Sequence, residues 1–118
     1  MSYMGGFVIA VPNANRDAFI DHAERMDPIF LEFGALRVIE GWGDNVPKGE
    51  VTDFHRAVQA TEDEAIVFSW IEWPDKATRD AAMEKMRTDP RMMAEPIPFD
   101  GNRMIFGGFV PVVTLERS

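Results

Sequence analysis

The chain has 118 residues, no cysteine and a formal net charge of −8 at pH 7. A chain of this length can bury one modest hydrophobic core, so we expect a single domain over residues 1–118. The lack of cysteine excludes disulfides and thiolate chemistry and removes the ligands of most structural zinc sites.

The charge balance also limits the partners. The 20 acidic residues outnumber the 12 basic ones, whereas a nucleic-acid-binding surface needs clustered Lys and Arg to neutralise phosphates. No apolar run approaches the ~20 residues of a membrane-spanning helix, and the N-terminus lacks the basic stretch of a signal peptide. We therefore expect a cytoplasmic protein with no nucleic-acid partner and no membrane partner.

Four segments predict β-strands. Residues 3–11 and 65–73 are apolar on both alternating sets of side chains, which is typical of strands covered on both faces. Residues 36–44 predict a further strand, and turn-forming residues follow it. The last strand is predicted over residues 103–115.

Two segments predict helices. The first is capped by Asn13 or Asn15 and ended by Gly34. Its apolar stripe has helical spacing and comprises Phe19, Ala23, Met26, Phe30 and Phe33. Pro28 lies inside this pattern and predicts a kink or a division into two helical pieces. The second helix is predicted over residues 75–89 and has a thinner apolar face.

The order of these elements is βαββαβ, and its two halves are weakly repeated. VPNANRDAF follows the first strand and WPDKATRDAA follows the third, each with a strand-ending proline and then Arg-Asp-Ala. This pattern predicts an α+β, ferredoxin-like antiparallel sheet with strand order 4-1-3-2 and both helices on one face.

The face of the sheet away from the helices is predicted to be apolar as well, with three tryptophans, Trp42, Trp70 and Trp73, in the second and third strands. A monomer would leave this patch in water. We therefore expect a homodimer in which two sheets pack face to face, the dimeric α+β barrel arrangement.

The segment GGFV occurs twice, once in the first strand and once in the last. In the order 4-1-3-2 these strands are antiparallel neighbours, so Gly5 and Gly6 are expected near Gly107 and Gly108. Glycine in a strand marks a bend or a close approach, and aromatic rings such as that of Phe109 can lie across the bare backbone. We predict a thin patch in the sheet that a side chain or a ligand must cover.

No nucleotide-binding, metalloprotease or hydrolase motif is present, and no carboxylate and histidine cluster has metal-ligand spacing, so no metal is expected. His22 lies at the edge of the apolar stripe, where it is either a structural residue or a base at the helix–sheet cleft. Asp53, His55 and Arg56 lie in the connection between the second and third strands. They form either a solvated loop or an anion-binding or proton-abstracting group, with His55 as the catalytic candidate and Arg56 as a ligand contact.

Further candidates follow along the chain. Asp100 and Arg103 belong either to a turn that leads into the last strand or to a pocket mouth in which Arg103 holds a carboxylate or enolate. Glu72 lies within a strand, as Glu40 does, and it either pairs with an arginine or acts as a base with a raised pKa. Trp70 and Phe109 are candidate ligand contacts, although tryptophans at strand spacing are more often interface residues.

Several stretches resemble one family of small bacterial proteins of unknown function, the YbaA-like family. They are EFGALRVIE, KGEVTDFHRAV, EDEAIVFSWIEWP and DPRMM followed by PFDGNRMIFGGF. The similarity runs along nearly the whole chain and implies a dimeric α+β barrel, related in fold to antibiotic-biosynthesis monooxygenases and stress-response barrel proteins. It implies no reaction. Asn102 stands where a lysine is common, and the loop before Pro98 is shorter, so a ligand beside this motif would differ in its charge preference.

Two hypotheses about function follow. The first is a homodimer that binds a small molecule in a helix–sheet cleft, with cofactor-independent monooxygenase or isomerase activity as the chemistry and no cofactor. The second is a structural or regulatory dimer without catalysis. A water-accessible pocket that holds Arg103, His55 or Glu72 would favour the first.

Overall fold

The computed structural model describes residues 2–117. In chain order its elements are β1 (Tyr3–Pro12), η1 (Asn13–Asn15), α1 (Arg16–Glu32), β2 (Arg37–Trp42), α2 (Phe54–Ala57), β3 (Glu64–Trp73), α3 (Lys76–Arg87), η2 (Pro90–Met93), η3 (Gly101–Arg103) and β4 (Ile105–Phe109). Within this part of the chain, no helix has the length and apolar character needed to cross a bilayer.

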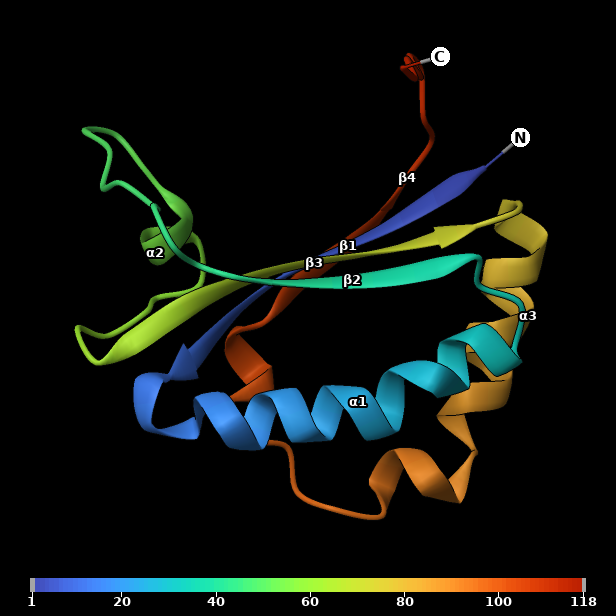
Figure 1. The fold of residues 1–118 in the computed structure, drawn as a ribbon, viewed down its shortest axis with the longest axis horizontal. Helices are drawn as coiled ribbons and strands as arrows, with labels where there is room; N and C mark the ends of the chain where they lie inside the picture. Colours follow the sequence, from blue (N-terminus) through green and yellow to red (C-terminus); the bar gives the residue numbers. More distant parts are fainter. Residues whose placement is uncertain (1, 118) are drawn as a thin grey trace.

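The four strands form one antiparallel sheet in the order β2-β3-β1-β4. This is the predicted order 4-1-3-2 counted from the opposite edge. The helices α1 and α3 lie on the same side of the sheet, and α2 lies at one end of the other side (Figure 1). The fold is therefore ferredoxin-like, as the alternation of strands and helices predicted.

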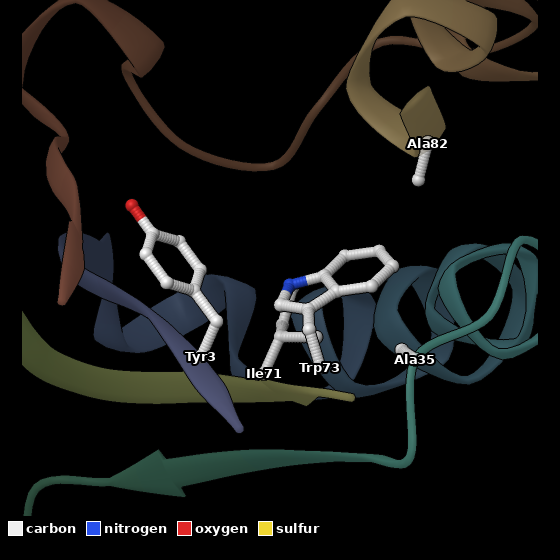
Figure 2. Close-up of a cluster of buried hydrophobic side chains, with 5 residues drawn as sticks. All are labelled: Tyr3, Ala35, Ile71, Trp73 and Ala82. Carbon is white, nitrogen blue, oxygen red and sulfur yellow. The ribbon is translucent and has the colours of Figure 1, made fainter. Parts of the chain in front are cut away.

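One part of the core lies between the sheet and α3. Trp73, at the end of β3, is 1% exposed, and it packs with Tyr3, Ile71, Ala35 and Ala82. Figure 2 shows the Tyr3 and Trp73 side chains extending from the sheet toward the helix that carries Ala82. Asp75 caps this helix by accepting a hydrogen bond from the Thr78 N–H at 2.7 Å, as expected for its position.

The first helix was predicted to be capped by Asn13 or Asn15 and to be kinked or divided at Pro28. α1 runs as one α-helix through Pro28 and is not divided in two. Ile29 is buried directly after the proline, and the Phe33 N–H bonds to the Ile29 carbonyl at 3.1 Å, so packing and the closed last turn keep the helix continuous. Asn15 occupies the N-cap position without capping through its side chain. Gly34 ends the helix with a positive φ of 111°, as predicted.

The last strand is shorter than predicted. β4 ends at Phe109, whereas the apolar pattern predicted a strand to residue 115. Phe109 pairs with Met4, and β1 begins only one residue before Met4, so the next residues have no neighbouring strand to bond. Residues 110–117 have no regular secondary structure, and Pro111 interrupts them.

The strand register assigns side chains to the two faces of the sheet. The open face, which α1 and α3 do not cover, carries apolar side chains on all four strands, namely Met4, Val8, Ile39, Phe68, Trp70, Ile105 and Phe109. Trp42 and Trp73 lie on the helix-covered face, so the prediction of three tryptophans on the open face was wrong for two of them. Their strand positions alternate with that of Trp70, and each packs against a phenylalanine of α1.

The glycine repeat pairs as predicted. Gly5 lies opposite Gly108 and Gly6 lies opposite Gly107 on the neighbouring strand. On the open face, the ring of Phe109 lies over Gly6 and Gly107, where a Cβ atom would come within 3.3 Å and 3.2 Å of it. On the other face the Tyr3 ring lies so close to Gly108 that any side chain there would clash. Aromatic residues of the sheet itself therefore cover the thin patch.

Candidate functional site

The inner cavity lies between the helix-covered face of the sheet and α1. Its volume is about 210 Å³, and its walls are largely apolar. The sheet contributes Phe7, Ile9 and Ile71, and α1 contributes Phe19 and Phe30. Four polar side chains also line it, namely His22, Asp27, Glu40 and Ser69. An apolar chamber with a few polar groups is the usual form of a small-molecule site.

Two carboxyl groups meet at one wall of the inner cavity. Glu40 lies opposite Ser69 in the β2–β3 register, so its side chain belongs to the helix-covered face. Glu40 Oε1 is buried and has no hydrogen-bond partner among residues 2–117. Asp27 approaches it from α1. Burial first, and then a side-chain hydrogen bond and charge repulsion between the two carboxyls, raise the pKa of Asp27 to about 8. The pair therefore holds a proton at neutral pH.

An outer groove runs on the other side of this wall. It has a volume of about 610 Å³, opens to solvent, and lies between α1 and the edge strand β2. Asp27 and Glu40 line both the groove and the inner cavity, and so do Phe19, Ala23 and Val38. The acid pair thus lies between the apolar space under the sheet and a more open, solvent-facing groove.

The connection between α3 and β4 closes the inner cavity on another side. Met92, Ile97 and Phe99 of this connection line the cavity. Glu95 of the same connection lies 2.9 Å from His22 Nδ1 and accepts a hydrogen bond from Arg25 at 2.7 Å.

Further contacts tie this connection to the first helix. Side-chain hydrogen bonds, first with Arg25 and then with His22, lower the pKa of Glu95. Asn15 donates a hydrogen bond to the Pro98 carbonyl at 2.9 Å, and Arg91 pairs with Glu32 at 2.8 Å. The cover of the cavity is therefore held to α1 by polar contacts along its length.

The structure brings Asp53, His55 and Arg56 together, as their spacing predicted, around the short helix α2. Asp53 caps α2 by accepting from the Arg56 N–H at 2.7 Å, and this backbone bond lowers the pKa of Asp53. His55 Nε2 lies 3.0 Å from the Val46 carbonyl. The Arg56 guanidinium donates to two loop carbonyls at 2.8 Å and 3.1 Å. These side chains organise the β2–β3 connection, and they line a shallow open depression there rather than the inner cavity.

Asp100 and Arg103 also lie together, at the start of β4. Arg103 donates to Asp100 at 3.0 Å, to the Gln59 carbonyl at 2.8 Å, and with two nitrogens to Glu64 at 2.7 Å and 2.6 Å. The Glu64 side chain is only 6% exposed, and Arg103 lowers the pKa of Glu64 to about 2. Both carboxylates therefore hold the arginine in place.

The remaining predicted residues lie on the open face of the sheet. Glu72 lies opposite Arg37, with their charged atoms 4.0 Å apart, which is the pairing considered for it from the sequence. The ring of Trp70 packs edge-on against Phe68, with centroids 6.0 Å apart. Phe109 covers the glycine patch. The predicted residues of this open-face group, the α2 group and the Arg103 group thus lie on different elements, and none of these three groups lines the inner cavity.

Sequence reasoning noted Glu40 as a strand carboxylate but missed Asp27. A signal for Asp27 was present, because it lies four residues after Ala23 and three before Phe30 and so falls on the apolar stripe of the helix. His22 was placed at the edge of that stripe, and the structure shows its side chain there, 14% exposed at the cavity.

The described residues do not contain a group of three or more His, Asp and Glu side chains that could hold a metal ion.

Solved structures share this fold. A dimeric ferredoxin-like protein from an uncultured marine organism superposes with a TM-score of 0.64 at 12% identity, over 97% of this chain and 98% of that chain. A monooxygenase from the gene ActVA-Orf6 of Streptomyces coelicolor, in complex with nanaomycin D, has a TM-score of 0.59 at 12% identity, over 99% and 93% of the two chains. HapK from Hahella chejuensis has a TM-score of 0.56 at 16% identity, over 100% and 99%. At these identities the likeness shows the fold alone.

Sequence comparison identifies nearer relatives. The family model DUF1428, which describes proteins of unknown function, matches residues 2–101. Uncharacterized protein YbaA of Escherichia coli K12 is 54% identical over 115 residues, which cover 96% of this chain and 98% of that protein. YbaA of Shigella flexneri matches to the same extent. The chain therefore belongs to the DUF1428 family, as its resemblance to YbaA-like proteins predicted.

Proposed function

We propose that this protein binds a neutral, mostly apolar small molecule in the inner cavity and works as a homodimer. The observation that carries the first part is the buried Oε1 of Glu40, which has no partner among residues 2–117, at the wall of a cavity of about 210 Å³. An unpaired buried acceptor costs about 1–3 kcal/mol. A ligand that donates a hydrogen bond would remove this cost.

The size and lining of the cavity limit the ligand. An engineered apolar cavity of ~150 Å³ holds a benzene molecule, so a cavity of about 210 Å³ suits a substituted ring or a small fused ring system. The apolar walls favour a neutral molecule, because a charged one would lose its hydration without a described counterion at the pair. Ser69 and His22 offer additional polar contacts at the walls.

The chemistry suggested from the sequence, a cofactor-independent monooxygenase or isomerase, is consistent with this site. A monooxygenase shares the fold, but a fold by itself is weak support for a reaction. The stronger support is chemical, because a carboxyl pair that holds one proton in an apolar chamber can accept a proton and donate one.

The residues proposed from the sequence for the site lie outside the inner cavity and stay predictions. They are the catalytic candidates His55, Glu72 and Arg103, and the ligand contacts Arg56, Trp70, Asp100, Arg103 and Phe109. Trp70 and Phe109 lie on the open face, where a partner subunit would cover them.

The open face supports the homodimer. Phe68 is 44% exposed and Phe109 is 59% exposed on the single chain, and they continue an apolar surface across all four strands. Monomers rarely leave a contiguous patch of this kind in water. Two similar solved proteins are described as dimeric, and a second copy packed sheet to sheet would bury both patches at once.

Ligand binding can be tested with 2-naphthol, a flat neutral molecule with one hydroxyl donor, by isothermal titration calorimetry. Ala23 is 9% exposed and lines the inner cavity, so Ala23→Leu should fill part of the space and weaken binding by about tenfold or more. Ala18→Leu, on the exposed side of the same helix, is the matched control and should bind as the unchanged protein does. Met26→Phe provides a second filling variant if Ala23→Leu does not fold.

Equal binding of 2-naphthol by the filled variants and the control would contradict the cavity as the site. Native mass spectrometry of the protein from its own host adds an independent measurement, since a retained ligand would appear as extra mass. A folded dimer that binds no small molecule in either experiment would instead support the alternative function, a structural or regulatory dimer without catalysis.

A further inference from the structure

The acid pair is built from two elements that meet only in the folded protein. Glu40 points from β2 into the helix-covered side of the sheet, and Asp27 comes from α1 against it. Both carboxyls line the inner cavity and the outer groove. A ligand in the cavity and a water molecule in the groove would therefore reach the same two groups.

No cation neutralises the pair. Neither Asp27 nor Glu40 has an ion-pair partner within 4.0 Å among residues 2–117. The nearby charged groups are engaged elsewhere. Arg16 and Arg37 line the outer groove as the pair does. The Arg16 guanidinium lies 5.5 Å from the Trp42 ring centre, and Arg37 Nε lies 4.0 Å from the Glu72 carboxylate.

The other ionisable neighbours do not change this picture. His22, which also lines the cavity, lies 2.9 Å from Glu95, and the Glu24 carboxyl group lines the groove. Two carboxylates that share a buried site without a counterion do not both ionise, so one retains its proton. The pair then presents one acceptor and one donor to the same ligand.

We propose that Asp27 and Glu40 are an acid–base pair that enolises a neutral, flat, apolar ketone bound in the inner cavity. Glu40 is the base, because its buried Oε1 accepts from no N–H or hydroxyl group of residues 2–117 and the neighbouring Asp27 carboxyl is its acidic contact. Asp27 is the acid, because it is the second carboxyl at the same cavity wall and the pair retains one proton. The inference rests on the proposed function, since the ketone must occupy the inner cavity.

The step balances without an oxidant, a metal or a cofactor. The Glu40 carboxylate takes a proton from the carbon next to the carbonyl, and the electrons of the broken C–H bond form the new C=C bond. The carbonyl oxygen gains the Asp27 proton and becomes the enol hydroxyl. Return of a proton from Glu40 to the same carbon gives exchange, and its return to a conjugated carbon gives an isomer, while the hydroxyl proton goes back to Asp27.

The test uses 2-tetralone, a flat bicyclic ketone, in deuterated buffer, with loss of its α-proton signals followed by proton NMR. The full-length protein should accelerate this exchange above the buffer rate. Glu40→Gln should lower the acceleration by about 10²-fold or more, and Asp27→Asn should lower it to a similar degree. Glu84→Gln, an exposed carboxylate of α3, is the control and should exchange as the unchanged protein does.

Binding of 2-tetralone is measured in parallel by saturation-transfer NMR, which separates the two proposals. Binding without accelerated exchange, or exchange that survives both Glu40→Gln and Asp27→Asn, would overturn the acid–base pair and leave the binding proposal standing. An absence of binding would overturn both. If the neutral variants do not fold by circular dichroism, Glu40→Asp is used instead; it keeps the charge but withdraws the carboxylate, and it should bind 2-tetralone while losing most of the exchange.

Discussion

Asp27 occupies a stripe position that apolar residues fill elsewhere on α1. The side chains one turn before and after it, Ala23 and Phe30, both line the inner cavity, as Asp27 does. The surroundings of Asp27 raise its pKa, because burial disfavours the charged form and Glu40 lies beside it. The folded state therefore binds a proton that the unfolded chain releases in mildly acidic solution.

This proton makes stability depend on pH in a definite direction. The pKa of Asp27 is about 8 in the folded protein and near ~4 in the unfolded chain. The folded state holds more protons between these values, so the pair's contribution to stability is full below about pH 4 and is lost as the pH rises to about 8. We expect Asp27→Asn to remove this dependence. Between about pH 4 and about pH 8, the free energy of unfolding of Asp27→Asn relative to the unchanged protein should increase by about 2 kcal/mol. The increase is limited to this size because the open groove partly screens the charge.

Urea unfolding at a series of pH values measures this difference directly. Asp21→Asn is the control, because Asp21 is an exposed residue of the same helix whose side chain pairs with Arg25 at 2.6 Å. A difference between Asp27→Asn and the unchanged protein that stays constant from about pH 4 to about pH 8 would show that Asp27 is ionised in the folded state.

At the scale of elements, the sequence was most informative where the pattern of one segment decided the outcome. Two-sided apolar strands, the start of the second helix at residue 75 and the helix end at Gly34 were each predicted correctly, because short-range chemistry determines them. Pro28 does not divide α1 in two, and the end of β4 was predicted wrongly, because other parts of the fold decide both. Ile29 packing keeps α1 in one piece, and the start of β1 determines where β4 runs out of a partner.

The candidate site shows the same division. The edge position of His22 follows from helical spacing, and the carboxylate of Glu40 is visible within a strand. Their meeting with Asp27 depends on how α1 crosses β2, which no single segment specifies. The sequence offered Arg103 as a possible ligand contact in a loop. In the structure, Arg103 forms ion pairs with Glu64 and Asp100.

Arg103 connects η3 to the start of β3 and to the residues that follow α2. Arg103→Met should leave the nearly buried Glu64 carboxylate without its partner and lower the free energy of unfolding by about 3 kcal/mol at neutral pH. Because Arg103 lowers the pKa of Glu64 to about 2, this stabilisation is present above about pH 4.5 and is lost as the pH falls toward 2. Urea unfolding should therefore show a smaller difference between the variant and the unchanged protein near pH 3 than at neutral pH.

Arg103→Lys tests the geometry of this contact. A lysine keeps the charge but cannot donate two parallel bonds to Glu64, so it should recover only part of the loss. Arg103→Met with unchanged stability at neutral pH would mean that the ion pairs contribute nothing to holding η3 against β3.

For the whole molecule, the open face determines the expected assembly. The unchanged protein should have twice the chain mass of 13.4 kDa by light scattering. Phe68→Lys places a charge in the middle of the open face and should shift the protein to the single-chain mass, since a buried unpaired charge is strongly unfavourable at an interface. Phe68 is 44% exposed on one chain, so the monomer should stay folded by circular dichroism.

Val51→Lys is the matched control, because Val51 is 91% exposed on the β2–β3 connection. It should leave the mass at twice that of the chain. A stable single-chain mass for the unchanged protein at micromolar concentration would contradict the face-to-face dimer. A Phe68→Lys protein whose mass remains twice that of the chain would contradict it as well.

The pairing of β1 with β4 has a consequence for synthesis on the ribosome. β1 is made first and its neighbour β4 last, so one edge of β1 stays without a partner until nearly the whole chain has emerged. An exposed strand edge readily recruits other chains. Gly5 and Gly6 lie on that edge, and glycine is a poor strand former. The glycine pair therefore makes the unpaired edge of β1 a weak template for aggregation until β4, with Gly107 and Gly108, has been synthesised and pairs with it.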